Sequence, residues 1–406
     1  MEPARSVNGG VFPPQFPGFP QAVPPAAPAG GTRPERAMFE EYTGGYQRSA
    51  DISPVRKRVL FICGSINQTK QLHQVAMQMS DVDASFSPYY CDGVLELVRR
   101  SGLLETTILG GKLGNRCLAY LRTFDLDVDF QGRRGPYDLV VTCSDLIMPA
   151  NIRGVPCVLV QEGMTDPENL LYHVVRRLRF LPRWLASTST TGLSGLYDRF
   201  CVASEGYRRL FIRKGVDPAA IVVTGIPNFD DCARYLVNDF PLRHYVLVCT
   251  SDMRETFKFE NRAKFIRKAV AIAAGRQLVF KLHPNENAAR AEREIRAHAP
   301  GALVFRSGNT EEMIANCDVL ITRYSTTVYV GLALGKECYS DFDLADLRSM
   351  VPLQHRSAAR NIAAVCTGLL DAPPLPAGGR HRRAAPPRRR SVPRAIMGAL
   401  FPGIGV

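Results

Sequence analysis

The sequence predicts an α/β protein with two doubly wound, Rossmann-like domains. The chain has 406 residues, which is more than one hydrophobic core ordinarily serves. Short runs of Val, Ile and Leu alternate with helical patterns, as in parallel sheets whose strands are buried on both faces. About five such runs precede residue 230 and about four follow it, so we expect two sheets that face a cleft.

The predicted strands share a continuous apolar centre and a turn signal at their carboxyl end. In the first domain they are residues 58–63, 137–145, 155–163, 199–204 and 221–227. In the second domain they are residues 245–252, 277–284, 302–308 and 317–325. The helical stretches between them give βα units, and such units form parallel sheets.

The chain divides into four predicted segments. Residues 1–52 are rich in Pro and Gly and form a predicted disordered tail. Residues 53–240 and 241–371 form the predicted N-terminal and C-terminal Rossmann-like domains. Residues 372–406 form a second predicted disordered tail, which is rich in Arg and Pro.

Composition narrows the classes of function. The net charge of +13 favours an anionic ligand or surface, without demanding nucleic acid. No run of about 18 apolar residues occurs, so we expect no membrane-spanning helix. The eleven cysteines are scattered through apolar segments without a C-x-x-C pair. We therefore expect buried, reduced thiols in a cytoplasmic protein, and no metal site.

Polar side chains follow the predicted strand at 277–284, in the stretch "FKLHPNEN". In doubly wound sheets, ligands bind outside the carboxyl ends of the strands. We therefore expect Lys281 and His283 to face the cleft. The spacing alone leaves a structural role for His283 equally open.

Two further strand ends carry groups that suit an anion. Ser325, Thr326 and Thr327 follow a buried strand and start a helix, where hydroxyls and free N–H groups bind phosphate. An ordinary helix cap is the alternative. Arg254 also follows a strand and can grip phosphate with two N–H groups, although a solvated arginine at a helix start is the simpler interpretation of that residue alone.

The first domain supplies candidates for polar contacts and for a general base. Gly64 permits a tight turn, and Ser65 and Asn67 can bind an oxygen-rich ligand. Asp145 and Glu162 stand at neighbouring strand ends, where a carboxylate can take a proton from a hydroxyl. Either acid can instead cap the helix that follows it.

The segment 170–188 mixes arginines with apolar residues and the single Trp184. Such a basic amphipathic segment can lie on an anionic membrane surface. A helix that covers the protein core explains the pattern equally well.

Three segments together resemble the donor-binding half of GT-B glycosyltransferases and UDP-N-acetylglucosamine 2-epimerases. In chain order they are "VLVCTSDMRETFKFEN", "FKLHPNEN" and "CDVLITRYSTTVYVGLALGKE". They are also similar to bacterial capsule and teichoic-acid polymer transferases. The resemblance covers roughly residues 55–365. In those families a K-x-H-P motif and a D-x-L-I-T-x-Y-S-S segment bind the diphosphate of a nucleotide-activated donor.

The resemblance implies a GT-B fold and a metal-independent, inverting glycosyltransferase without a cofactor. Its donor would be a UDP- or CDP-linked sugar, and its acceptor a carbohydrate or a lipid-linked hydroxyl in cell-surface polysaccharide or glycolipid biosynthesis. The donor diphosphate would be bound by His283, Ser325 and Thr326. Arg254 would also bind it, because this residue falls where the epimerases have an Arg. The protein would be cytoplasmic, with peripheral contact at the inner face of the cell membrane.

Two alternatives stay open. The first is 2-epimerisation of a UDP-sugar. One departure argues against it, because the sequence has Val328-Tyr329-Val330-Gly331 at the place where the epimerases carry paired glutamates. The second is a non-catalytic GT-B-like scaffold that binds a nucleotide sugar or a partner. Nucleic acid is not an expected partner, because only the Arg-rich tail suggests it.

Overall fold

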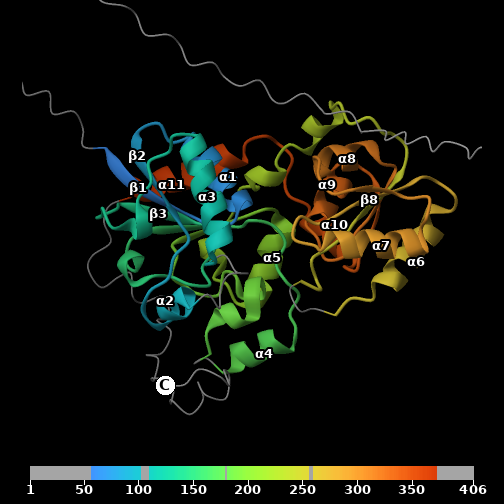
Figure 1. Ribbon diagram of the computed structural model, residues 1–406. Helices are drawn as coiled ribbons and strands as arrows, with labels where there is room; N and C mark the ends of the chain where they lie inside the picture. The colour runs from blue at the N-terminus through green and yellow to red at the C-terminus, as the bar shows by residue number, and fades with distance from the viewer. Residues whose placement is uncertain (1–55, 102–108, 179–180, 256–258, 373–406) are drawn as a thin grey trace, which may run out of the picture. The chain divides into compact units, whose positions relative to one another are not determined.

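The computed structural model describes residues 56–101, 109–178, 181–255 and 259–372 (Figure 1). The two predicted tails lie outside these ranges, apart from Ala372. Two parallel sheets form the framework of the described chain. This arrangement confirms the predicted α/β class.

The first sheet has six strands in the order β2-β1-β3-β4-β5-β6, and every neighbouring pair is parallel. The strands are β1 (Lys57–Cys63), β2 (Val82–Pro88), β3 (Leu139–Thr142), β4 (Cys157–Val160), β5 (Arg199–Val202) and β6 (Ile221–Val223). Leu60 and Ile62 of β1 join one hydrophobic cluster, while Val59 and Phe61 join another. Because side chains alternate along a strand, this sheet is covered on both faces.

The second sheet has five parallel strands in the order β11-β10-β7-β8-β9. They are β7 (Val246–Cys249), β8 (Leu278–Lys281), β9 (Leu303–Phe305), β10 (Val319–Ile321) and β11 (Glu337–Tyr339). Again the faces alternate, since Val246 and Val248 pack in a different cluster from Leu247. Two doubly wound sheets are therefore confirmed.

Helices connect the strands, as the βα pattern predicts. In the described residues they are α1 (Ile66–Ala76), α2 (Gly93–Arg100), α3 (Gly111–Thr123), α4 (Leu170–Arg177), α5 (Glu205–Lys214), α6 (Arg262–Ala273), α7 (Ala288–His298), α8 (Thr310–Asn316), α9 (Thr327–Ala333), α10 (Leu344–Met350) and α11 (Ala358–Leu370). Helix α5 shows the local logic: the Ser204 side chain caps its first turn, and Gly215 ends it with φ of 96°.

All nine predicted strands are present, and two further strands were not predicted. Both of these are edge strands, with a neighbour on one side only. Strand β2 has the sequence VDASFSP and is partly exposed, and β11 has only three residues. An edge strand does not need apolar residues throughout, so it lacks the signal that revealed the others.

The last described helix returns to the first sheet. Helix α11 packs against α1, β3 and β4, and Figure 1 shows it beside β3 and α1. Its fully buried Ile362 and Cys366 join the cluster that contains Val59 and Phe61. The predicted limits 53–240 and 241–371 stay predictions, but the sheet of the first is completed by a helix from the second.

Burial of the cysteines is confirmed, since all eleven lie in the described residues and are buried with free thiols. Every helix within the described ranges is too short or too polar to span a lipid bilayer. The predicted amphipathic segment forms α4 and a 3-10 helix, η3 (Arg183–Thr190), that packs against it.

Candidate functional site

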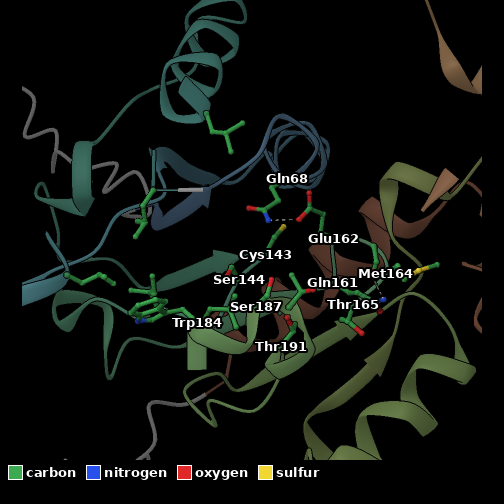
Figure 2. Close-up of a pocket in the computed structure, with 17 residues that line it drawn as sticks. Gln68, Cys143, Ser144, Gln161, Glu162, Met164, Thr165, Trp184, Ser187 and Thr191 are labelled. Carbon is green, nitrogen blue, oxygen red and sulfur yellow. Dashed lines mark hydrogen bonds between the residues drawn. The ribbon is translucent and has the colours of Figure 1, made fainter. Parts of the chain in front are cut away.

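Glu162 lies just beyond β4, and two side chains hold its carboxylate. Ser65 Oγ donates to Oε1 at 2.6 Å. Gln68 Nε2 donates to Oε2 at 2.5 Å (Figure 2). Each carboxylate oxygen has two lone pairs, so both can accept a further hydrogen bond. The carboxylate is therefore fixed in orientation and still able to act on a ligand.

The local sequence after β1 builds this support. Ser65 has extended backbone angles and caps α1, accepting from the N–H of Gln68 at 3.2 Å. The Gln68 side chain, one turn along the helix, then folds back over Gly64. A Cβ at Gly64 would lie 2.0 Å from Gln68 Oε1, so a side chain at this position would displace the Gln68 amide. The sequence analysis did not predict a role for Gln68. The signal was its position three residues after the helix cap Ser65, which places the two side chains next to each other.

A cavity of about 380 Å³ opens beside Glu162. Figure 2 shows Glu162, Gln68 and Cys143 on one side of it and Trp184 on another. Among the described residues of its lining Glu162 alone is charged, and Leu and Ile side chains contribute much of the rest. Its volume is within the range of about 300–1,000 Å³ that small-molecule sites occupy.

Asp145, the second predicted base, has a different environment. It is 1% exposed and is absent from the cavity lining. Its carboxylate accepts from the N–H groups of Gly192 at 3.0 Å and Ser194 at 2.9 Å, and from Arg183 Nη1 at 3.1 Å. Asp145 thus anchors the segment that follows η3.

Asn67, also predicted in the loop after β1, presents an exposed side chain. Its backbone carbonyl accepts from Asn228 Nδ2 at 3.3 Å. The structure therefore brings Gly64 and Ser65 to Glu162, and leaves the Asn67 side chain in solvent.

The three motif segments of the second domain follow neighbouring strands. The segment with Arg254 follows β7, the one with His283 follows β8, and the one with Ser325 follows β10. Strand β7 pairs with both β8 and β10 in parallel. Their carboxyl ends therefore share one edge of the sheet, as the sequence predicts.

His283 is partly buried at this edge. Its Nδ1 accepts from the N–H of Asn285 at 3.3 Å and lies 3.6 Å from Asp252 Oδ2. Burial lowers the pKa of His283 below its usual value of 6.5. A neutral ring that accepts at Nδ1 carries its proton on Nε2, which can donate to a phosphate oxygen.

Lys281 lies two residues earlier, in β8, and is 6% exposed. Its Nζ donates to the carbonyl of Leu282 at 3.0 Å, and burial lowers the pKa of the ammonium group. The ammonium of Lys281 is thus held within the fold, in contrast to the ring of His283.

Arg254 meets carboxylates. Its two Nη atoms each donate to Glu294 at 2.8 Å, and this contact raises the pKa of Arg254. Nε lies 3.5 Å from Glu260 Oε2, and Nη2 lies 3.7 Å from Glu286 Oε1. A phosphate would have to replace Glu294 in order to use both Nη atoms.

A buried ionic cluster lies under Arg254, and sequence reasoning missed it. The Glu260 and Glu286 side chains are fully buried, and Arg262 pairs with both. Thr250 Oγ1 donates to Glu286 Oε2 at 2.6 Å, while burial raises the pKa of Glu286. The final Glu of "FKLHPNEN" is thereby explained, because it is the buried partner of an arginine and not an exposed turn residue.

Ser325, Thr326 and Thr327 lead into α9, as predicted. Ser325 Oγ and Thr327 Oγ1 are 2.9 Å apart, and Thr326 makes no side-chain cap. Because α9 has only seven residues, we assign it no dipole-based anion site. One of these two hydroxyls donates to the other, which leaves the second hydroxyl proton as an available donor at this strand end.

The loop with Glu162 touches the loop with Thr326. A Cβ at Gly163 would lie 3.0 Å from Thr326 Cγ2, a contact too close for most side chains. Nearby, the hydroxyls of Tyr207 and Tyr329 are 2.5 Å apart and buried. The predicted base and the predicted diphosphate segment are therefore neighbours in space.

No protein-family model and no curated protein sequence matches the chain. Solved structures with a similar fold include the UDP-GlcNAc 2-epimerase of Neisseria meningitidis bound to UDP-GlcNAc. Its TM-score is 0.49 at 10% identity, and the match covers 77% of this chain and 100% of that one. The UDP-GlcNAc 2-epimerase of Methanocaldococcus jannaschii, in complex with UDP-GlcNAc and UDP, has a TM-score of 0.44 at 12% identity and coverages of 78% and 93%.

The wall teichoic acid polymerase TagF is also similar, with a TM-score of 0.42 at 11% identity, over 78% of this chain and 89% of that chain. These are the kinds of protein that the sequence motifs resemble. At such low identity and TM-score, the likenesses carry no argument about the reaction.

Proposed function

We propose that the protein is a glycosyltransferase that moves a sugar from a UDP- or CDP-linked donor to a hydroxyl acceptor, in cell-surface polysaccharide or glycolipid biosynthesis. One observation carries this proposal. The Glu162 carboxylate faces a cavity, while the adjacent Gly163 touches Thr326 of the diphosphate segment. A base beside an acceptor cavity and next to a donor segment is the arrangement that transfer needs.

The chemistry follows from these positions. Glu162 accepts the proton of the acceptor hydroxyl, and the acceptor oxygen forms a bond to the anomeric carbon of the donor. The bond between that carbon and the diphosphate oxygen breaks, and its electron pair stays on the diphosphate. Attack opposite the leaving group inverts the configuration.

Donors at the edge of the second sheet would stabilise the departing diphosphate. His283 offers Nε2–H, and the hydrogen-bonded pair of Ser325 and Thr327 offers one hydroxyl proton. Such prearranged donors lower the barrier because they act where negative charge develops. Arg254 would join them once Glu294 releases it.

Epimerisation is supported less well by the same geometry. An epimerase needs acid and base groups on both faces of the sugar, and Asp145 is already committed to Gly192, Ser194 and Arg183. An epimerase also does not bind an acceptor, so it does not require a cavity for one. Product analysis separates the two reactions, because an epimerase consumes no acceptor.

We also propose a cytoplasmic protein that rests on an anionic membrane through α4. This helix buries Tyr172 and Val175 and leaves other apolar and basic side chains exposed. The exposed side chains are Leu170, Leu171, Val174, Leu178, Arg176 and Arg177. Apolar insertion and attraction between arginine and anionic lipid act together on such a helix. Flotation with anionic vesicles, but not with zwitterionic ones, is the expected result.

Calorimetry with nucleoside diphosphates and nucleotide sugars tests the main proposal. We expect one nucleotide to bind to the wild type, His283→Ala to weaken that binding by about tenfold, and His244→Ala, at an exposed histidine, to leave it unchanged. Absence of binding across the panel would refute both enzymatic functions. Binding without turnover on any acceptor would favour the scaffold.

A further inference from the structure

The cavity beside Glu162 is lined mainly by hydrocarbon. Its apolar side chains come from separate parts of the first domain, namely Leu95, Leu113, Leu146, Ile147, Met164 and Trp184. Each of these is only partly buried by the protein, so apolar surface stays uncovered here. Uncovered apolar surface in a concave site favours a ligand with an apolar body, by about 25 cal/mol for each Å² buried.

The polar groups expose less of the lining surface than hydrocarbon does. Gln161 is already satisfied, because Nε2 donates to the carbonyl of Gly163 and Oε1 accepts from the N–H of Ala203. The other polar groups are mostly hydroxyls, including Ser187 and Thr191. A carbohydrate carries a hydroxyl on almost every carbon, and burying these against leucine would leave them unpaired at a cost of about 1–3 kcal/mol each.

Charge disfavours a second class of ligand in the cavity. Among the lining residues that the structure describes, Glu162 is the charged one, and none of them is Lys, Arg or His. A phosphate placed beside that carboxylate would meet repulsion without a compensating cation. Any diphosphate of a lipid-linked acceptor must therefore lie outside the cavity.

We propose that the cavity binds the hydrocarbon body of an amphiphilic alcohol whose hydroxyl lies at Glu162. This assignment deepens the proposed transfer reaction and rests on it for the role of the hydroxyl. Of the two acceptor classes left open above, a carbohydrate or a lipid-linked hydroxyl, this assignment selects the lipid-like one. The position of α4 agrees, since this helix packs against η3, which supplies Trp184 to the lining.

The chain offers a direct probe of occupancy. Trp184 lines the cavity and is the only tryptophan of the chain, so its fluorescence reports this site alone. We would titrate the full-length protein with n-alkanols from 1-butanol to 1-octanol, with geraniol, and with methyl glucoside. We expect saturable changes with the alcohols, with the dissociation constant falling about fourfold for each added methylene, and no change with methyl glucoside.

Two variants on one helix provide the matched control. Leu113 and Leu118 both lie in α3 and are both half-buried, but only Leu113 lines the cavity. We expect Leu113→Gln to weaken 1-octanol binding by about tenfold and Leu118→Gln to leave it unchanged. If Leu113→Gln does not fold, as judged by circular dichroism, Ile147→Asn replaces it.

The outcomes separate this inference from the proposed function. Octanol that fails to saturate the Trp184 signal, or methyl glucoside that binds more tightly than octanol, would overturn the assignment. Nucleotide calorimetry on the same protein tests the transfer reaction independently. Octanol binding without nucleotide binding would support the apolar site and refute the proposed glycosyltransferase. Nucleotide binding without octanol binding would support the enzyme and refute the apolar acceptor.

Discussion

Ser65 donates its hydroxyl proton to Glu162 Oε1 across 2.6 Å, although 97 residues separate the two along the chain. The contact joins the ends of β1 and β4, which are separated in the sheet by β3. Together with Gln68 it sets the direction of the carboxylate. A base whose orientation is fixed in advance loses no entropy when the acceptor arrives.

Glu162→Gln should abolish proton removal while keeping the size of the side chain. We expect kcat for transfer to fall by about 10²–10⁴-fold, because general-base catalysis contributes this much, with little change in nucleotide affinity. Initial rates and calorimetry measure the two effects. Glu205→Gln, at an exposed glutamate of α5, serves as the control. An equal loss of nucleotide affinity would place Glu162 in donor binding instead.

Gly163→Ala tests the contact between the two loops. The new methyl group would lie 3.0 Å from Thr326 Cγ2 and push the diphosphate segment away. We expect kcat/KM to fall by about tenfold, since small misplacements of reacting groups are costly. Thr326→Ser removes the opposing methyl group and should restore the rate in the double variant. Gly368→Ala, where the added Cβ meets nothing within 4 Å, should have no effect.

Asp145→Ala should damage folding more than chemistry. The change leaves two N–H groups and the Arg183 guanidinium without their carboxylate partner. Removing one member of a buried ion pair costs about 3 kcal/mol, which urea denaturation can measure. The exposed Asp239→Ala supplies the comparison. A stable Asp145→Ala protein that has lost transfer would assign the catalytic role to Asp145.

Glu294→Gln asks whether Arg254 serves the donor. Loss of the carboxylate charge weakens the grip on both Nη atoms and makes them available to phosphate. We expect nucleotide affinity to rise by about tenfold, the scale of one hydrogen bond to a charged group. Glu292→Gln on the same helix affects only the exposed pair with Arg306 and is the control. Unchanged affinity with lower stability would make Arg254 structural.

Stability should decrease in mild acid because of His283. Burial lowers its pKa in the folded protein, so the unfolded chain binds a proton at higher pH than the folded one. The free energy of unfolding therefore falls as the pH drops through about 6.5, until the folded pKa is reached. Burial of His73 acts in the same direction.

His283→Asn should make this dependence shallower without removing it. Urea midpoints at about pH 7.5 and 5.5 provide the measurement. His244→Asn, at a histidine whose side chain is 85% exposed, should keep the slope of the wild type. An unchanged slope in His283→Asn would show that other groups set the acid sensitivity.

Much of the fold could be predicted because buried parallel strands leave a strong signal. Runs such as Val246–Cys249 are covered on both faces and are apolar throughout. Strands β2 and β11 escaped because an edge strand tolerates Asp83, Ser85 or Glu337. Their existence depends on pairing with a neighbour, which no local pattern records.

The site was predictable only in part. The strand-end rule predicted that Ser65, Glu162 and His283 follow strand ends, and the structure places them there; their roles stay predictions. It could not identify the partner of Arg254, since Glu294 lies 40 residues away on a helix. Nor could it separate Glu162 from Asp145, whose difference lies in three hydrogen bonds from the segment 183–194.

The return of α11 to the first sheet affects the order in which the nascent chain can mature on the ribosome. Strands β3 and β4 emerge early, yet the helix that covers one of their faces is translated near the end of the described chain. Apolar residues such as Val158 and Val160 cannot complete their packing until Ile362 and Cys366 have been synthesised. Domains generally fold in the order of their synthesis, but the hydrophobic cluster on this face of the first sheet stays incomplete until the second sheet has been made.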